Sequence, residues 1–135
     1  MMLVDTNVLI DVLEDDPEWA EWSVTQLRAQ SQIHELMINP LIYAELSLAF
    51  KAWEELDEVV DQLGLVVQDL PRAALFLAGK AFIRYRSAGG AKSNVLPDFF
   101  IGAHAAVQGV SILTRDASRY KSYFPGIRLV TPYAS

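Results

Sequence analysis

Short apolar runs alternate along the chain with longer segments in which apolar residues recur every three or four positions. Buried β-strands are predicted from five of these runs, at residues 2–4, 36–38, 65–67, 110–113 and 128–130. Helices are predicted from the segments between them, at residues 8–13, 17–31, 41–50, 54–63, 71–86 and 97–109. Strands that alternate with helices are typical of a mostly parallel sheet covered on both faces. The pattern therefore predicts an α/β domain with a central sheet of four to five strands.

Polar residues and proline mark several of the predicted helix boundaries. Asp16 before Pro17, and Asn39 before Pro40, each predict an N-cap followed by proline in the first turn. Gly64 predicts the end of the amphipathic helix at 54–63. For the first helix, Thr6 and Asn7 are both suitable N-caps, and we expect the helix to begin after one of them.

The composition fits one domain that folds around an apolar core. The chain has 135 residues and no cysteine, which excludes disulfides and thiolate metal sites and is typical of a reducing compartment. The N-terminus lacks a basic region ahead of an apolar core, and the longest uncharged run, 99–114, contains glycine, histidine and glutamine. Neither a signal peptide nor a membrane span is predicted. We expect a soluble cytoplasmic protein with a single domain over residues 1–135.

The net charge of −6 conceals an uneven distribution of acids and bases. Residues 1–69 contain 15 of the 17 acidic residues, whereas residues 70–135 contain nine of the 11 basic ones. This asymmetry suggests one anionic and one cationic partner. Solvent-facing helices that differ in charge explain it equally well.

Four acidic residues lie in unusually apolar surroundings. Asp5 and Asp116 each follow a predicted strand, Asp98 opens an apolar helix, and Glu45 is the only charged residue between positions 41 and 50. Each has an ordinary explanation by itself, as a turn residue, a helix N-terminal acid or part of an exposed stripe. The carboxyl ends of parallel strands and the starts of the following helices share one edge of the sheet. We therefore expect the four side chains to lie together.

A cluster of buried carboxylates requires a compensating positive charge, because ionised groups are costly to bury and repel one another. Carboxylate oxygens are suitable ligands for Mg²⁺ or Mn²⁺. Such an ion activates a bound water and stabilises charge on a phosphate, so phosphodiester hydrolysis needs no protein nucleophile. The two histidines, His34 and His104, lack the spacing of metal ligands and are interpreted as structural or surface residues.

In these positions the chain resembles the PIN-domain ribonucleases. The resemblance rests on Asp5-Thr6-Asn7 after the first strand, Glu45 in an apolar helix, Asp98 in Leu-Pro-Asp-Phe-Phe-Ile-Gly-Ala-His-Ala, and Thr114-Arg115-Asp116 before Tyr120. The closing stretch, 114–132, is similar to the ends of VapC toxins from bacterial toxin–antitoxin pairs. The resemblance covers essentially the whole chain.

The resemblance implies a three-layer α/β/α fold and an Mg²⁺- or Mn²⁺-dependent endoribonuclease that a small VapB-type antitoxin holds in check. Asp5, Glu45, Asp98 and Asp116 would form the metal site, with Asp5 and Asp98 as direct ligands and the other two acting directly or through water. Thr6, Asn7 and Thr114 would orient the acids or the attacking water. Members of this family commonly form homodimers.

The resemblance also gives the charged and aromatic residues possible partners. Candidate contacts to RNA phosphates are the bases Lys80, Arg84, Arg86, Lys92 and Arg115. Candidate contacts to the antitoxin are the tryptophans of the early helices, Trp19, Trp22 and Trp53.

Three other functions are compatible with parts of the pattern. A PIN scaffold without catalytic activity would have the same acids. A haloacid-dehalogenase-like phosphatase also begins with an aspartate after a strand, but it expects a second acid two residues later, where this chain has Asn7. A receiver-like regulatory domain that binds Mg²⁺ accounts poorly for Glu45 and for the basic half.

Overall fold

Five short strands form one parallel sheet at the centre of the protein. The computed structural model describes residues 1–92 and 95–133. The strand order is β3-β2-β1-β4-β5, and each of the four neighbouring pairs is parallel. The strands are β1 (Met2–Val4), β2 (Leu36–Ile38), β3 (Val66–Val67), β4 (Ser111–Leu113) and β5 (Leu129–Val130). The predicted mostly parallel sheet of four to five strands is confirmed.

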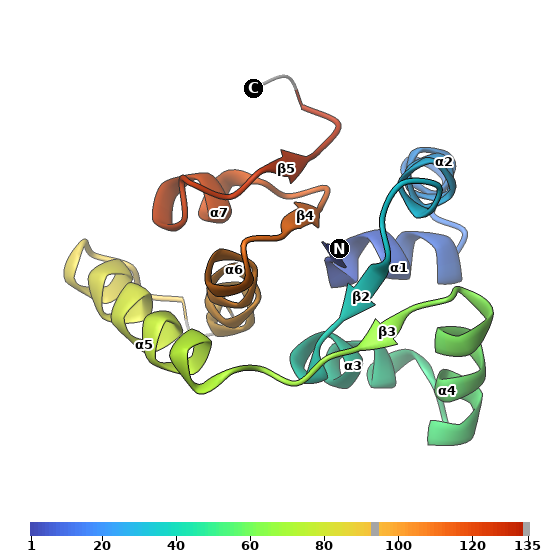
Figure 1. Ribbon diagram of the computed structural model, residues 1–135, viewed down its shortest axis with the longest axis horizontal. Helices are drawn as coiled ribbons and strands as arrows, with labels where there is room; N and C mark the ends of the chain where they lie inside the picture. Colours follow the sequence, from blue (N-terminus) through green and yellow to red (C-terminus); the bar gives the residue numbers. More distant parts are fainter. Residues whose placement is uncertain (93–94, 134–135) are drawn as a thin grey trace.

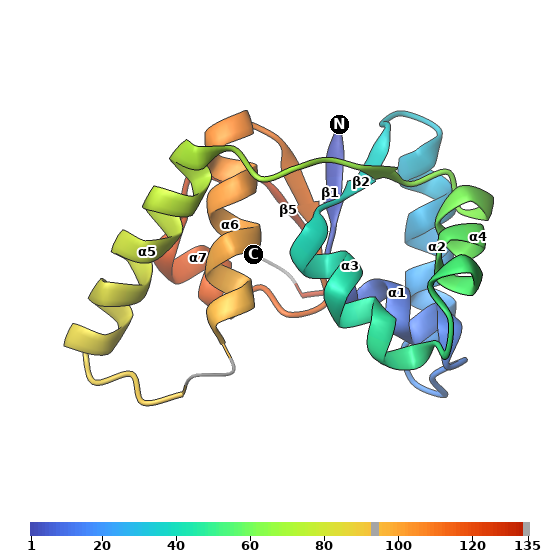
Figure 2. The ribbon, with the colours of Figure 1, turned by 90° about the horizontal axis from the view of Figure 1, so that it is seen from below.

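Helices flank this sheet on both sides. In two perpendicular views, α1, α2 and α4 lie to one side of the strands and α5–α7 lie to the other (Figures 1 and 2). Helix α3 lies between them and contacts both α1 and α6. The α-helices are α1 (Thr6–Leu13), α2 (Ala20–Ser31), α3 (Pro40–Leu46), α4 (Trp53–Gln62), α5 (Arg72–Ser87), α6 (Leu96–Gln108) and α7 (Ser118–Tyr123), and a 3₁₀ turn, η1 (Ser47–Ala49), follows α3. This is the three-layer α/β/α arrangement that the resemblance implied.

The middle of the sheet is the core of the molecule. Leu3, Met37 and Ile112, on the three central strands, are fully buried. Helices cover both faces there, so successive positions of these strands are apolar instead of every second one, with Ser111 at the start of β4 as the exception. The unbroken apolar runs in the sequence have this cause, and they made the central strands predictable.

Side-chain caps explain where two helices begin, and a turn held by a side chain explains the start of a third. The Asn39 side chain accepts a hydrogen bond from Ile42 N at 3.0 Å, as expected of the predicted cap. The first helix is capped by Asp5, whose carboxylate accepts from Thr6 N, so the expectation of Thr6 or Asn7 at this place was wrong. Asp16 holds a turn at residues 17–19 by accepting from two backbone N–H groups, and α2 therefore begins at Ala20 instead of at Pro17.

Helix α7 was not predicted. It has only six residues, too few for an apolar periodicity to be visible, and it is held by the buried side chains of Tyr120 and Phe124. Ser93 and Asn94, in the predicted loop after α5, lie outside the described residues. In the part of the chain that the structure describes, no helix has the length and apolar character that a membrane crossing requires.

Candidate metal-binding site

Asp5 is delivered to the carboxyl edge of the sheet by the central strand β1, and it is 5% exposed. Its Oδ2 accepts hydrogen bonds from Tyr120 Oη and Thr114 Oγ1, both at 2.8 Å. Its Oδ1 accepts from Thr6 N at 2.8 Å. Burial raises the pKa of Asp5 to about 6, although these hydrogen bonds oppose the rise. The carboxylate is thus well oriented but lacks a full counter-charge.

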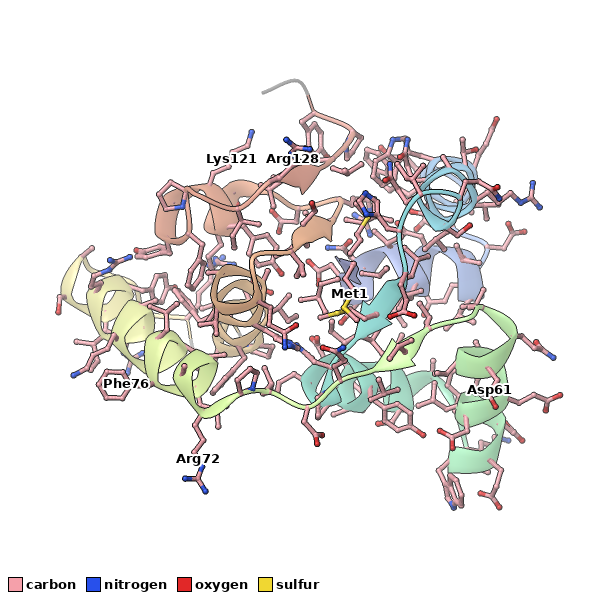
Figure 3. The ribbon with its side chains drawn as sticks, viewed as in Figure 1. Met1, Asp61, Arg72, Phe76, Lys121 and Arg128 are labelled. Atoms are coloured by element: carbon pink, nitrogen blue, oxygen red, sulfur yellow. The ribbon has the colours of Figure 1, made fainter. Side chains whose placement is uncertain are left out.

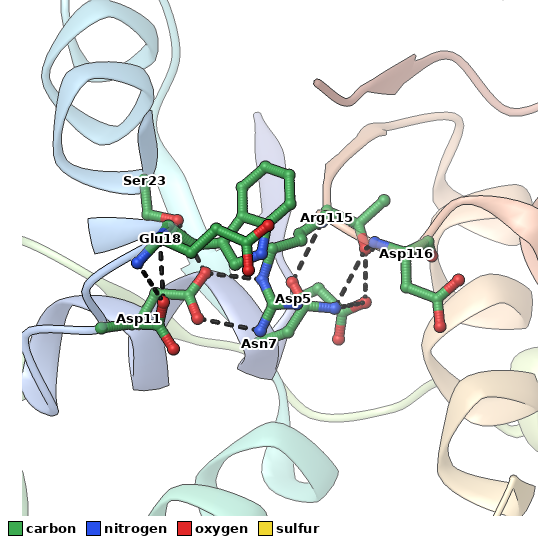
Figure 4. A network of polar contacts seen from close by, with 10 residues as sticks. Asp5, Asn7, Asp11, Glu18, Ser23, Arg115 and Asp116 are labelled. Carbon is green, nitrogen blue, oxygen red and sulfur yellow. Dashed lines mark hydrogen bonds and ion pairs between the residues drawn. The ribbon is translucent and has the colours of Figure 1, made fainter. Parts of the chain in front are cut away.

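The polar residues singled out from the sequence lie around this carboxylate. Asn7 Nδ2 is 3.4 Å from Asp5 Oδ2, and Asn7 Oδ1 accepts from Arg115 N at 3.0 Å (Figure 4). Thr114 Oγ1 accepts from Asp116 N at 3.1 Å while it donates to Asp5. Thr6 Oγ1 donates to Glu45 Oε1 at 2.7 Å. Each of the three therefore contacts an acid or the loop that carries one.

The four acids come from four different elements but share one electrostatic environment. Asp98 lies in the first turn of α6, Asp116 follows β4, and Glu45 lies near the end of α3, not early in it as the sequence suggested. Burial raises the pKa of Asp98 and of Glu45. The charge of Asp98 raises the pKa of both Asp5 and Glu45, and the charge of Asp116 raises that of Asp98. Asp98 thus interacts with all three of the others.

The raised pKa of Asp5 predicts how the stability of the metal-free protein depends on pH. The ordinary pKa is near 3.8 and the folded-state value is about 6, so the folded protein binds a proton more tightly than the unfolded chain. The stability that proton binding at Asp5 contributes is complete below the pKa of Asp5 in the unfolded chain, and it is lost as the pH rises through about 6. We expect the free energy of unfolding to decrease over this range by up to about 3 kcal/mol through Asp5.

Urea unfolding at a series of pH values from 4 to 7.5 measures this effect. Glu45 and Asp98 also have raised pKa values, so the contribution of Asp5 is the difference between the wild type and Asp5→Asn. If the free energies of unfolding of the two proteins change in parallel from pH 4 to 7.5, the raised pKa of Asp5 is contradicted.

The donor set fits Mg²⁺ or Mn²⁺, because it consists of carboxylate oxygens of which several are partly removed from water. Among residues 1–92 and 95–133, however, no three acidic or histidine side chains lie close enough together to enclose an ion. One reason is visible at Asp98, whose Oδ2 accepts a hydrogen bond from Arg119 Nη1 at 2.8 Å. The acids have the right chemistry and a common location, and they would need to close in on an ion.

A second ion pair at this edge was missed in the sequence. Asp11 of α1 is 1% exposed and accepts two hydrogen bonds from the Arg115 guanidinium, at 2.8 and 2.9 Å (Figure 4). Ser23 Oγ of α2 also donates to Asp11, and the guanidinium lies over the ring of Trp19. Asp11 is the only charge in the apolar segment 8–13, the same signal that identified Glu45. This pair fastens the loop containing Thr114 and Asp116 to α1 and α2.

The predicted RNA-binding residues fall into two places. Lys80, Arg84 and Arg86 are exposed on α5, and exposed Lys92 follows that helix. Arg84 donates to the backbone carbonyl of Tyr123 at 3.3 Å, and Lys80 and Arg86 lie over phenylalanine rings. Arg115 is separate from this group, because its guanidinium is bound by Asp11.

The two histidines do not join the acids as a metal-binding group within the described residues. His104 is fully buried on α6, and its Nδ1 lies 3.1 Å from Asn39 Nδ2. Since Asn39 caps α3, this contact links the start of α3 to α6.

Several solved structures share this fold over nearly the whole chain. A chain of VapBC2 from Rickettsia felis, bound to a DNA fragment from its promoter, has a TM-score of 0.74 and 19% identity, covering 96% of this chain and 97% of that one. A chain of DNA-bound VapBC from Salmonella typhimurium has a TM-score of 0.70 and 22% identity, with 96% of each chain covered. FitAcB from Neisseria gonorrhoeae has a TM-score of 0.69 and 19% identity, with both chains covered completely.

Comparison with curated proteins gave no significant match. The family model of the PIN domain matches residues 2–123, which include all four acids and every strand except β5. The match confirms the resemblance seen in the sequence: the chain belongs to the PIN-domain family.

Proposed function

We propose that the protein is an Mg²⁺- or Mn²⁺-dependent endoribonuclease that acts as the toxin of a type II toxin–antitoxin module in the cytoplasm. In this proposal residues 1–135 form a single PIN domain, with Asp5, Glu45, Asp98 and Asp116 as its metal site. The observation that carries the proposal is that hydrogen bonds connect three of these acids at the carboxyl edge of the sheet. Thr6 donates to Glu45 and to Asp5, and Thr114 links Asp5 to the backbone of Asp116.

Each residue has a distinct part in this proposal. Asp5 and Asp98 would bind the ion directly, and Glu45 and Asp116 would bind it directly or through water. When bound, the ion would supply an activated water and a positive charge for the phosphate under attack. Thr114 and Asn7 hold Asp5, while Thr6 holds Glu45 through its hydroxyl. These contacts keep the carboxylates oriented, so less ordering is needed when an ion binds.

A VapB-type antitoxin is the proposed protein partner. The fold is shared with chains from structures of VapBC and of a toxin–antitoxin complex from Klebsiella pneumoniae. On this chain, a groove of about 230 Å³ beside α3 and α4 is lined by Tyr43, Phe50 and Trp53. Trp53 is 67% exposed there, whereas Trp19 and Trp22 are partly buried and contact each other edge to face. Such a surface is suited to an apolar peptide segment. A homodimer is also part of the proposal.

The basic face of α5 is the proposed binding surface for RNA phosphates. Lys80→Gln combined with Arg84→Gln is expected to weaken RNA binding and to lower the slope of log K against log salt by about 1.5, since each lost phosphate contact removes about 0.7–0.9. Fluorescence anisotropy with a labelled RNA, in Ca²⁺ at several salt concentrations, measures both quantities.

A matched control for this variant is Arg28→Gln with Lys51→Gln, which removes the two exposed bases of the acidic half. The control changes the net charge equally but should leave the salt slope as in the wild type. An unchanged slope in the α5 variant would show that the RNA binds elsewhere.

RNA cleavage by purified, antitoxin-free protein tests the proposed function. A structured RNA is incubated with Mg²⁺ or Mn²⁺, and then with EDTA, for the wild type and for Asp98→Asn. We expect cleavage that requires the metal and is lost in the variant. Cleavage that survives both EDTA and the substitution would indicate a different mechanism or a contaminating nuclease. A wild-type protein that cleaves no RNA with either metal would favour a catalytically silent PIN scaffold.

A further inference from the structure

Arg119 of α7 contributes a positive charge to the acidic edge from within the chain itself. Its Nη1 donates to Asp98 Oδ2 at 2.8 Å, and its guanidinium lies 5.8 Å from the centre of the Tyr85 ring. The arginine thus bridges α6, which carries Asp98, and α5, which carries Tyr85. It is bound to one of the four acids of the proposed metal site.

The guanidinium places a positive charge beside an oxygen that would bind the metal ion. Mg²⁺ binds carboxylate oxygens at roughly 2.0–2.1 Å and keeps an ordered shell of oxygen ligands around it. A guanidinium that is hydrogen-bonded to that oxygen takes one of its lone pairs and repels a cation bound to the other. An ion at Asp98 Oδ2 is therefore bound more tightly when the arginine moves away.

Arg119 is held less firmly than the other arginine at this edge, because its acid is less buried and one hydrogen bond instead of two joins the pair. The side chains of Arg119 and Asp98 are 22% and 34% exposed, and one hydrogen bond joins them. In the Arg115–Asp11 pair the acid is 2% exposed, and two hydrogen bonds join the partners. A partly exposed ion pair separates at little cost in free energy, because water replaces its contacts, whereas separating a buried ion pair costs much more.

We propose that Arg119 is a positioning residue that serves as the counter-ion of Asp98 in the metal-free protein and competes there with the divalent cation. The proposal rests on the proposed function, because it takes the four acids to be the metal site. In the metal-free state the arginine offsets part of the repulsion among the acids. Metal affinity is then set by the exchange of one cation for another, not by the carboxylates alone.

Titration calorimetry with Mn²⁺ on the full chain, without RNA, tests the competition. Arg119→Gln removes the charge and should bind Mn²⁺ about fivefold more tightly than the wild type, since the ion no longer displaces a cation. Arg119→Lys keeps a positive charge with fewer donors and should fall between the two. The control Arg128→Gln loses the same charge directly before β5, at the opposite edge of the parallel sheet, and should match the wild type (Figure 3).

The outcomes separate this proposal from the function on which it rests. Tighter binding by Arg119→Gln, with Arg128→Gln unchanged, supports the competition. Wild-type binding that is equal to or stronger than that of Arg119→Gln overturns the role of Arg119 but leaves the metal site intact. Absence of Mn²⁺ binding in all of the proteins overturns both. Thermal unfolding of each variant, followed by circular dichroism, confirms that the proteins compared are folded.

Discussion

Asp5→Asn is expected to lower RNA cleavage at least about a hundredfold while the fold is retained. The substitution keeps the size of the side chain but removes the charge that would hold an ion at the end of the central strand. The side-chain oxygen can still accept from Tyr120 or Thr114, which now both donate to the carboxylate. The variant also avoids burying an ionised carboxylate, so the loss of activity should not follow from unfolding.

Single-turnover cleavage of a labelled RNA in saturating Mn²⁺, together with a urea unfolding curve, measures both parts of this prediction. Asp61→Asn is the matched control, because it makes the same change at an exposed position of α4 (Figure 3). The control should cleave at the wild-type rate. An Asp5→Asn protein that is folded and cleaves within about threefold of the wild type would show that Asp5 lies outside the catalytic site.

Arg115→Met is expected to lower the free energy of unfolding by about 3 kcal/mol. The guanidinium forms two of the hydrogen bonds to Asp11, which is 1% exposed, and methionine can form neither. The carboxylate would then be buried without this cation, and among residues 1–92 and 95–133 Ser23 is its remaining side-chain donor.

A double variant separates the loss of the ion pair from the loss of packing on Trp19. Asp11→Leu combined with Arg115→Met removes both charges and should recover most of the stability lost in Arg115→Met alone. Equilibrium urea unfolding of the two single variants and the double variant gives the coupling energy. A loss below about 1 kcal/mol in Arg115→Met, or a double variant as unstable as the sum of the single ones, would contradict a structural role for this pair.

The parts of the fold that were predictable are those in which local sequence and tertiary packing agree. The central strands were found because burial on both faces requires continuous apolar runs, and α3 and α4 because Asn39 and Gly64 mark their boundaries. The start of α2 was misplaced because the Asp16 side chain satisfies N–H groups in a turn that resembles a helix cap in sequence. Helix α7 is too short to have a periodicity of its own.

The acids of the candidate site were likewise predictable, because a charge in an apolar segment is visible in the sequence. Their cationic partners were not. Arg119 and Asp98 are 21 residues apart and Arg115 and Asp11 are 104 apart, so no local pattern relates either pair. Tyr120 was noted only as part of the family motif, yet its hydroxyl is buried against Asp5. Such contacts depend on how α7 and the loop before it pack onto the sheet edge.

Asp5, Glu45, Asp98 and Asp116 are proposed to bind a divalent cation together. The most direct test is a crystal of the protein soaked in Mn²⁺, with diffraction recorded on both sides of the manganese absorption edge. We predict an anomalous peak within about 2.0–2.4 Å of the Asp5 and Asp98 carboxylates, with the Arg119 side chain turned away from Asp98. A fully soaked crystal with no anomalous peak among the four acids, and with Arg119 still bound to Asp98, would contradict the proposed metal site.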